Sequence, residues 1–313
     1  MKSRNYAGIS LLASLAACNS ATAETVQKNS TQDLKKPNVI VILADDLGYG
    51  DLKCYGAKNV ETPHVDKLAS EGIRFTNAHT VAATSTPSRY SLLTGEYAWR
   101  RPDTDIAAGD VKMIIRPEQY TMADMFKSAG YATAAIGKWH LGLGDKTGGQ
   151  DWNAPLPAAL GDLGFDYHYI MAATADRVPC VFIENGKVAN YDPSDPIEVS
   201  YTKNFPGEPT GKDNPELLYN LHPSNGHDMS IVNGISRIGF MKGGGKALWK
   251  DENIADSITP FMPSTLSNSI KTSLSLCILQ PMMYTFLVFP MTASVERILW
   301  DYAETQSPNS TGR

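Results

Sequence analysis

A short segment, Ser85-Thr86-Pro87-Ser88-Arg89, places a small nucleophile one helical turn before an arginine. If a helix begins here, the Ser85 hydroxyl lies among backbone N–H groups that have no partner within the helix, and such groups favour an anion. Pro87 suits a first helical turn because its missing N–H is not needed there. Arg89 then lies on the same helix face and can bind the same anion. The pattern indicates nucleophilic chemistry on an anionic group, although a Ser-Pro-Arg turn by itself is more often structural.

Two other clusters of polar residues have types and positions suited to chemistry. Asp45 and Asp46 follow an apolar run, and paired carboxylates are oxygen ligands that suit a hard divalent cation. The alternative for this pair is an acidic turn that caps a helix. Lys138 and His140 end a second run, from Gly130 to His140, where a single lysine or histidine would ordinarily be a surface charge or a structural loop residue.

The elements around these residues predict how they come together. The run 38–43 is rich in β-branched apolar residues without alternation, which is typical of a strand buried on both faces. Further strands are expected over 73–80 and 131–136. Helices are expected from Pro63 to Gly72 and over 120–129, and 85–93 is expected to be a loop that enters a helix ending at Gly95. Alternating strands and helices predict an α/β fold with a mixed, mostly parallel central sheet flanked by helices, and ligands gather at the carboxyl ends of such strands.

The longer runs resemble the signatures of a known family. Ser85 to Gly95 closely resembles the first sulfatase signature, and Gly130 to His140, ending in Gly-Lys-Trp-His, is similar to the second. The resemblance covers roughly Pro37 to Ser257. It implies the alkaline-phosphatase-like fold and an enzyme of the sulfuric ester hydrolase class, an arylsulfatase-type sulfatase.

The resemblance also implies roles for particular residues. Asp45 and Asp46, with the oxygen derived from Ser85, would hold a divalent cation, usually Ca²⁺. Ser85 would be oxidised to formylglycine by a serine-type maturase, a bacterial route. Arg89 would stabilise the formylglycine hydrate. Lys138 and His140 would bind the sulfate and meet the bridging oxygen. His227 is the candidate for the family's further active-site histidine.

The expected substrate is a sulfated carbohydrate or an aryl sulfate. A phosphomonoesterase or phosphodiesterase of the same superfamily is the alternative, and so is an inactive truncated remnant that retains glycan binding. The chain carries 28 basic and 33 acidic residues, a net charge of −5, which gives no reason to expect a nucleic-acid partner. Its 42% hydrophobic content excludes wholesale disorder.

The first residues indicate export. Residues 1–17 have a basic start and an apolar run too short to span a bilayer, which is typical of a signal peptide. The run ends in Leu15-Ala16-Ala17-Cys18, which looks like a lipobox, so lipid attachment at Cys18 and a polar tether over 18–36 are expected. The alternative is an ordinary signal peptide. The predicted location is the periplasm or outer membrane of a bacterium, where Cys54, Cys180 and Cys277 have no evident pairing.

The chain changes character after residues 37–259, the N-terminal part of the expected catalytic domain. Residues 260–313 contain only six charged residues but 14 Ser or Thr, and no helical or strand period fits the apolar run from Leu274 to Phe289. A shifted reading of permitted codons gives a long, stop-free, sulfatase-like string. We therefore expect an out-of-frame tail after Thr259. The family's second metal-ligand pair does not follow His227, so we expect an incomplete fold, a weakly bound cation and little activity.

Overall fold

The computed structural model describes residues 36–258 and 274–280, and the described residues from Pro37 onward belong to one compact unit. The predicted leader, tether and lipidated Cys18 lie outside the described residues, apart from Lys36, and stay predictions. In the described part of the chain, no helix combines the length and the apolar character that a membrane span requires.

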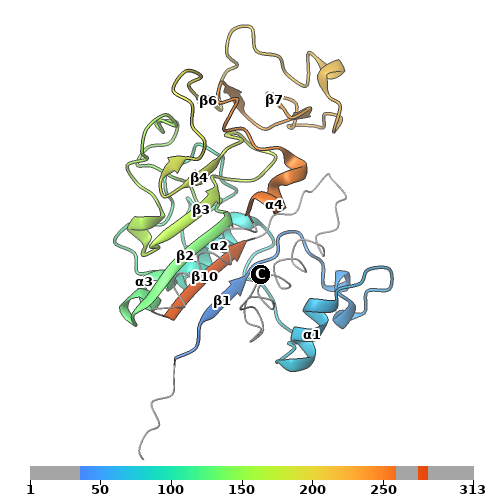
Figure 1. The fold of residues 1–313 in the computed structure, drawn as a ribbon, viewed down its shortest axis with the longest axis vertical. Helices are drawn as coiled ribbons and strands as arrows, with labels where there is room; N and C mark the ends of the chain where they lie inside the picture. The colour runs from blue at the N-terminus through green and yellow to red at the C-terminus, as the bar shows by residue number, and fades with distance from the viewer. Residues whose placement is uncertain (1–35, 259–273, 281–313) are drawn as a thin grey trace, which may run out of the picture. The chain divides into compact units, whose positions relative to one another are not determined.

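A six-stranded sheet forms the centre of this unit, in the order β1-β10-β2-β3-β4-β5 (Figure 1). The first four strands in this order run parallel, and the last two pair antiparallel. The mixed, mostly parallel sheet confirms the predicted fold class. The strands of the central sheet are β1 (Val39–Ile42), β2 (Tyr131–Lys138), β3 (Tyr167–Met171), β4 (Phe182–Glu184), β5 (Lys187–Val188) and β10 (Leu274–Gln280).

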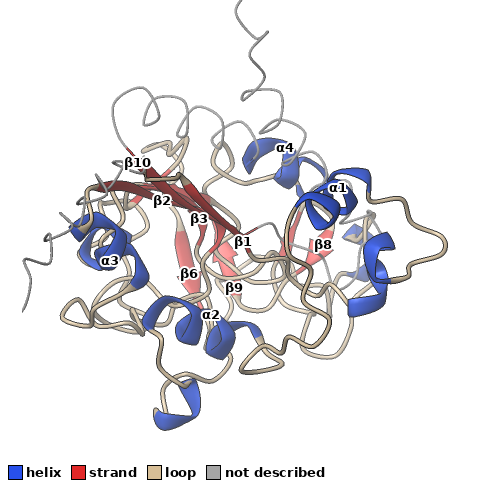
Figure 2. Ribbon diagram, turned by 90° about the horizontal axis from the view of Figure 1, so that it is seen from below, coloured by secondary structure: helices blue, strands red, loops and turns tan. Residues whose placement is uncertain are grey.

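Helices flank the sheet, and α2 and α3 lie on the same side of it (Figure 2). Their ends follow from sequence. Gly95 ends α2 with a left-handed backbone, φ 70°, and donates its N–H to Ser91 O. Thr121 caps α3 through a reciprocal pair of bonds with Asp124. The helices are α1 (Pro63–Glu71), α2 (Ser85–Thr94), α3 (Met122–Ser128) and α4 (Ile254–Ile258).

Short hairpins and 3₁₀ turns occupy the connections after β3, and they suit a segment, 145–223, that is rich in Gly and Pro. Two small antiparallel sheets pair β6 (Glu198–Ser200) with β9 (Phe240–Lys242) and β7 (Ile231–Val232) with β8 (Ile235–Ser236). The 3₁₀ turns are Tyr49–Asp51, Lys53–Tyr55, Ala98–Arg100, Leu160–Leu163, Pro215–Leu217 and Asp251–Asn253.

The strand expected over 73–80 is wrong. This segment is irregular, and Ile73 and Phe75 are 84% and 66% exposed. Its backbone is tied down by side chains instead, because the Tyr55 hydroxyl donates to Phe75 O at 2.9 Å. Two alternating apolar residues, Ile73 and Phe75, do not define a strand when no neighbouring strand is there to pair with the segment.

Two expectations about the central strands also need correction. Residues 274–280, for which no period was expected to fit, form β10 between β1 and β2, in the register Val39↔Leu276↔Thr133. A short apolar run without alternation suits such a central position, and the error came from judging the tail by its average composition. β1 is only half buried rather than buried on both faces, because among the described residues β10 is its one partner strand.

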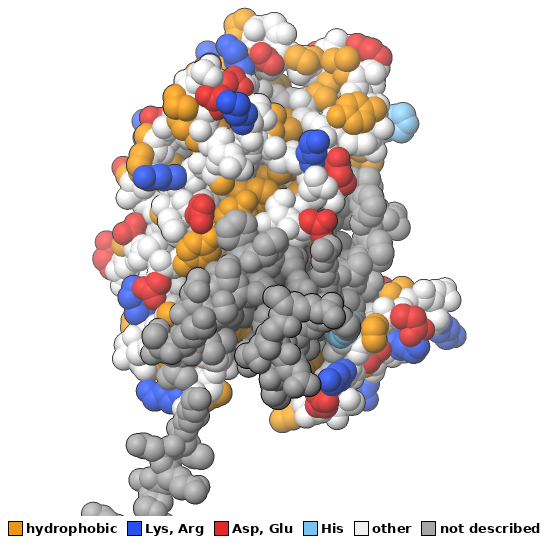
Figure 3. Space-filling view, in the orientation of Figure 1, with side chains coloured by type: hydrophobic (Ala, Val, Ile, Leu, Met, Phe, Trp, Pro, Cys, Tyr) orange, Lys and Arg blue, Asp and Glu red, His pale blue; other side chains and the backbone are white. Residues whose placement is uncertain are grey.

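The core lies between α2 and the sheet and continues under the loops that follow β3. Tyr90 and Leu93 of α2, Ile136 of β2 and Ile170 of β3 are buried in it. The face shown in Figure 3 mixes acidic and basic side chains rather than separating them, in keeping with the small net charge.

Candidate active site

Three parallel strands bring the polar clusters to one edge of the sheet. Asp45 and Asp46 follow β1, Lys138 is the last residue of β2, and the segment from Thr174 to Arg177 follows β3. Because parallel strands share the direction of their carboxyl ends, all three segments meet at the same edge. The site is therefore assembled from residues that are far apart in the sequence.

Ser85 is the first residue of α2, whereas the sequence placed it in a loop just before the helix. Its half-buried hydroxyl accepts a hydrogen bond from Arg89 Nε at 2.7 Å. Arg89 is 1% exposed and also donates from Nη1 to Lys138 O at 2.9 Å. These bonds fix the nucleophile and the guanidinium together at the positive end of the helix dipole, where an anion is favoured.

The cations beside Ser85 share one carboxylate. Lys138 Nζ donates to Asp45 Oδ2, and Arg89 Nη2 lies 3.7 Å from Asp45 Oδ1. Burial, and then the charge of Arg89, lowers the pKa of Lys138 to about 8, although Asp45 acts in the opposite direction. Burial lowers the pKa of Arg89 to about 10. Both groups are still mainly cationic at neutral pH, so the site favours an anionic substrate group.

His140 is a neutral imidazole held in one orientation. Burial, and then the charge of Lys138, lowers its pKa to about 3. Its Nε2 lies 2.8 Å from Ala107 O, so this nitrogen carries the proton. The Thr86 hydroxyl donates to His140 O at 3.0 Å and so joins α2 to the end of β2. His140 Nδ1 is a buried acceptor without a hydrogen-bond partner among the described residues.

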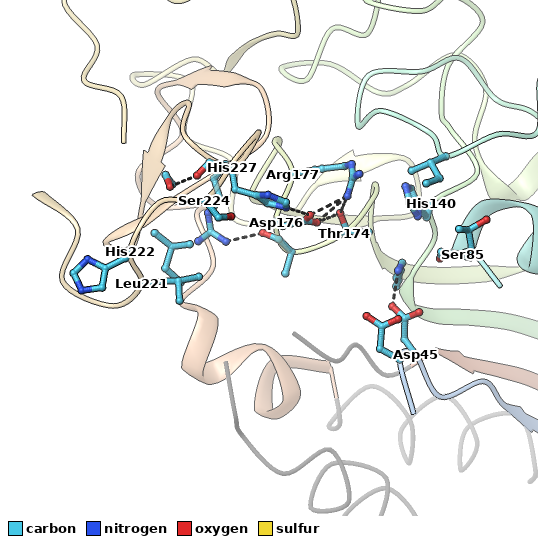
Figure 4. Close-up of a pocket in the computed structure, with 18 of the residues that line it drawn as sticks. Asp45, Ser85, His140, Thr174, Asp176, Arg177, Leu221, His222, Ser224 and His227 are labelled. Carbon is cyan, nitrogen blue, oxygen red and sulfur yellow. Dashed lines mark hydrogen bonds and ion pairs between the residues drawn. The ribbon is translucent and has the colours of Figure 1, made fainter. Parts of the chain in front are cut away.

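A cavity of about 200 Å³ opens over these residues (Figure 4). All the predicted site residues line it except Arg89, which lies behind Ser85 and contacts it. The structure thus brings together the residues that the sequence selected. The predicted residues on the cavity wall are Asp45, Asp46, Ser85, Lys138, His140 and His227.

The cavity has a second polar wall that sequence reasoning missed. Thr174, Asp176 and Arg177 form it together with His227, whose Nε2 lies 2.9 Å from Asp176 Oδ2. The signal was present, since Asp176 and Arg177 follow an apolar strand at the ligand-binding edge of the sheet. Two histidines carry no motif in the sequence, which favours a structural role. His168 accepts from Gly186 N inside the core and fits that role, whereas His222 lies on the cavity wall.

The residues near Asp45 supply only part of the ligand set that a divalent cation requires. Asp45 and Asp46 supply carboxylate oxygens, but Ca²⁺ takes six to eight oxygen ligands. Among the described residues, no group of three or more His, Cys, Asp or Glu side chains could hold a metal ion. Lys138 also occupies one oxygen of Asp45. The described residues by themselves therefore do not form a complete cation site.

A parallel sheet with a nucleophile at a helix start, two cations and a neutral imidazole defines an α/β enzyme class that acts on anionic groups. The family model that matches the chain is Sulfatase, over residues 37–220. The chain belongs to the sulfatase family, which confirms the resemblance found in the sequence. Members of this family generally use a divalent cation and formylglycine.

Individual relatives agree with this assignment. The chain is 56% identical over 248 residues to N-acetylgalactosamine-6-O-sulfatase of Bacteroides thetaiotaomicron, a match that covers 79% of this chain and 47% of that protein. It is 48% identical over 118 residues to steryl-sulfatase of Mus musculus, which covers 35% of this chain and 18% of the relative. The chain thus spans at most about half the length of these curated relatives.

Solved structures show the same fold. A Bacteroides thetaiotaomicron structure titled for the metabolism of multiple glycosaminoglycans superimposes with a TM-score of 0.82 at 47% identity, covering 86% of this chain and 59% of that one. A second structure, titled Ps i-CgsB, has a TM-score of 0.55 at 20% identity and covers 87% of this chain and 55% of that one. The latter similarity concerns the fold alone.

Proposed function

We propose that this protein hydrolyses sulfate esters of glycans, with N-acetylgalactosamine 6-sulfate as the first substrate to test. The single observation that carries the proposal is the bond from Arg89 Nε to Ser85 Oγ at the start of α2, with Lys138 and His140 beside it. The family assignment and the relative that is 56% identical, an N-acetylgalactosamine-6-O-sulfatase, support it.

A serine-type maturase would oxidise Ser85 to formylglycine, passing the two hydrogens to an electron acceptor, and the hydrate of that aldehyde would supply the nucleophile toward sulfur. This chemistry needs a base that takes the proton of the attacking hydroxyl, a proton for the departing sugar oxygen, and a base for the second hydroxyl when sulfate is released and the aldehyde is restored.

Arg89 and Lys138 bind the sulfate oxygens and neutralise the charge that develops on them. Neutral His140 offers Nδ1 as a proton acceptor, because its Nε2–H is committed to Ala107 O. A protonated histidine could not take this role, and the lowered pKa keeps the ring neutral at any physiological pH. Asp45 holds Lys138 in place for sulfate binding.

Asp45 and Asp46 would contribute to a cation site whose other ligands are not among the described residues. A bound cation would supply further positive charge next to the sulfate. Export and lipid attachment at Cys18 would bring the protein to sulfated glycans outside the cell, and both remain predictions.

The test is to co-express the full chain with a serine-type maturase and to examine Ser85 and turnover together. Mass spectrometry of the peptide that contains Ser85 is expected to show the loss of two hydrogens. Hydrolysis of 4-nitrophenyl sulfate is expected to depend on this residue and to vanish in Ser85→Ala.

Two outcomes would contradict the proposal. Hydrolysis by the Ser85→Ala variant at the rate of the unchanged chain would show that Ser85 does not supply the nucleophile. Hydrolysis of 4-nitrophenyl phosphate by an unmodified chain that leaves the sulfate ester intact would favour the phosphoesterase alternative.

A further inference from the structure

A buried threonine of α2 has no part in the chemistry described above, yet it contacts the two segments that hold His140. We propose that Thr86 is a positioning residue that keeps His140 in a single tautomer, with the proton on Nε2 and with Nδ1 as the acceptor. The inference rests on the proposed function and deepens it, because it names the residue that prepares His140 to take up a proton.

The Thr86 hydroxyl makes one hydrogen bond as a donor and one as an acceptor. It donates to His140 O at 3.0 Å and accepts from Ala107 N at 3.2 Å. A hydroxyl has a single proton to donate, so the two bonds together fix its orientation. Thr86 is 0% exposed, so water cannot replace either bond. One side chain of α2 therefore joins two segments that are distant from it in the sequence.

The same network ends at the imidazole of His140. Ala107 O lies 2.8 Å from His140 Nε2, and a carbonyl oxygen can only accept, so Nε2 carries the proton. Ala107 lies in the irregular segment between Ala98–Arg100 and α3, where the described backbone forms no helix or strand that would fix this carbonyl. The bond from Ala107 N to Thr86 supplies that constraint. Thr86 thus holds the acceptor that selects the tautomer.

The backbone of His140 also depends on Thr86. His140 has φ 57°, in the left-handed region, which a residue with a side chain adopts at a cost and keeps only where its surroundings hold it. His140 N donates to Ala172 O at 3.2 Å, and His140 O accepts from the Thr86 hydroxyl. The two peptide groups that flank the His140 Cα are therefore held by different elements, one by the segment after β3 and the other by α2.

The tautomer decides what His140 can do in the reaction. Figure 4 places His140 beside Ser85, so the ring lies next to the group whose hydrate must lose protons. Only a ring nitrogen without a proton can accept one. His140 Nδ1 has no hydrogen-bond partner among the described residues, so the bond at Nε2 is the one that selects the tautomer. If Ala107 moved, Nε2–H would lose its acceptor and the proton could transfer to Nδ1.

The test uses variants that remove the hydroxyl with little change of shape. Thr86→Val replaces the hydroxyl by a methyl group, and Thr86→Ser keeps it. Thr133→Val is the matched control, because the Thr133 hydroxyl in β2 also donates to a backbone carbonyl, Gly164 O at 2.6 Å, and accepts from a backbone N–H, Asp166 N at 3.0 Å. Thr133 is 2% exposed, so it is buried like Thr86, but its bonds lead away from Ala107.

The tautomer is measured by ¹⁵N NMR at neutral pH on the full chain, labelled at the ring nitrogens of its six histidines. The signals that disappear in His140→Gln assign the ring. A protonated and an unprotonated ring nitrogen resonate far apart, and two tautomers in rapid exchange give signals between these limits. This measurement requires neither maturation nor turnover. KM and kcat for 4-nitrophenyl sulfate are then measured on the matured chain, and urea unfolding reports stability.

In the unchanged chain we expect a protonated Nε2 and an unprotonated Nδ1 at His140. Thr86→Val should bring the two signals toward each other and lower kcat by roughly 10- to 100-fold, the order of loss when a reacting group is displaced by about 1 Å. KM should change little, because the sulfate is bound by Lys138 and Arg89. Thr86→Ser should keep the tautomer and most of kcat. Thr133→Val should lose stability like Thr86→Val but keep both the tautomer and kcat.

An unchanged tautomer in Thr86→Val would overturn the inference, whatever happens to kcat. Equal losses of kcat in Thr86→Val and Thr133→Val would also overturn it, because they would reflect a general loss of stability. A mixed tautomer with an unchanged kcat would show that the position of His140 does not matter to the reaction. Failure of the unchanged, matured chain to hydrolyse the sulfate ester would instead contradict the proposed function, and the NMR result does not depend on that outcome.

Discussion

The ion pair between Arg237 and Asp251 supports the backbone beneath the second polar wall of the cavity, and its loss should be costly. Both side chains are almost completely buried, at 0% and 1% exposed. Arg237 donates to Asp251 through two bonds of 2.8 and 2.6 Å, and to Ala175 O and Val232 O. The substitution Asp251→Ala removes the counter-charge but leaves a guanidinium that water cannot reach.

The magnitude follows from that burial. Breaking a buried pair by removing one partner costs about 3–5 kcal/mol in the free energy of unfolding, because one charge is left uncompensated. At about 2–4 °C of melting temperature per kcal/mol for a domain of this size, the midpoint should fall by about 6–20 °C. The pair Lys242–Glu198, 3.8 Å apart and roughly half exposed, is the contrast. Glu198→Ala should cost at most about 1 kcal/mol.

The assay is thermal and urea unfolding of the full chain and both single variants, followed by circular dichroism. A double variant, Arg237→Met with Asp251→Leu, removes both charges and should be more stable than Asp251→Ala alone. If Asp251→Ala is no more destabilising than Glu198→Ala, the burial argument fails. If the double variant is the least stable, the cost comes from lost bonds to Ala175 and Val232 rather than from an uncompensated charge.

Three further predictions concern other parts of the chain. The Lys138 pKa is about 8, and only the ammonium form binds sulfate, so the affinity for 4-nitrophenyl sulfate should fall about tenfold per pH unit above that value. The Lys138→Arg variant stays charged, so calorimetry of this variant should show no such fall. Thr121→Ala should lower the free energy of unfolding by about 1 kcal/mol, because it removes the cap of α3. Thr121→Ser should keep most of this stability, as measured by urea titration. Resequencing the gene from the codon of Lys250 should show a shifted frame near Thr259, and a confirmed frame would refute the predicted out-of-frame tail.

Local signals in the sequence were sufficient for the helices that position the nucleophile. A helix beside Ser85 that ends at Gly95 and a second helix within 120–129 depend on contacts within a few residues. The structure confirms both helices, starts the first at Ser85 and places the second at Met122–Ser128 with Thr121 as its cap. The edge of the sheet that gathers Asp45 and Lys138 was also predictable, because buried parallel strands have a recognisable composition.

Contacts between distant segments were not predictable. The bond from His227 to Asp176 joins residues 51 apart, and neither neighbourhood resembles a motif. Likewise, whether residues 73–80 form a strand depends on the presence of a partner strand, which no local pattern encodes. The sequence therefore predicted the sulfate side of the cavity and missed most of the opposite wall.

The central place of β10 has a consequence for biosynthesis. β1 and β2 are not neighbours in the sheet, since β10 lies between them, and it comes from much later in the chain. At about 5–20 residues per second, synthesis takes on the order of ten seconds between the end of β2 and the end of β10. During that interval the nascent chain has two strands with no shared partner, and such long-range closure is slow to fold. The central sheet can therefore be completed only after residues 274–280 have been synthesised, wherever the chain folds.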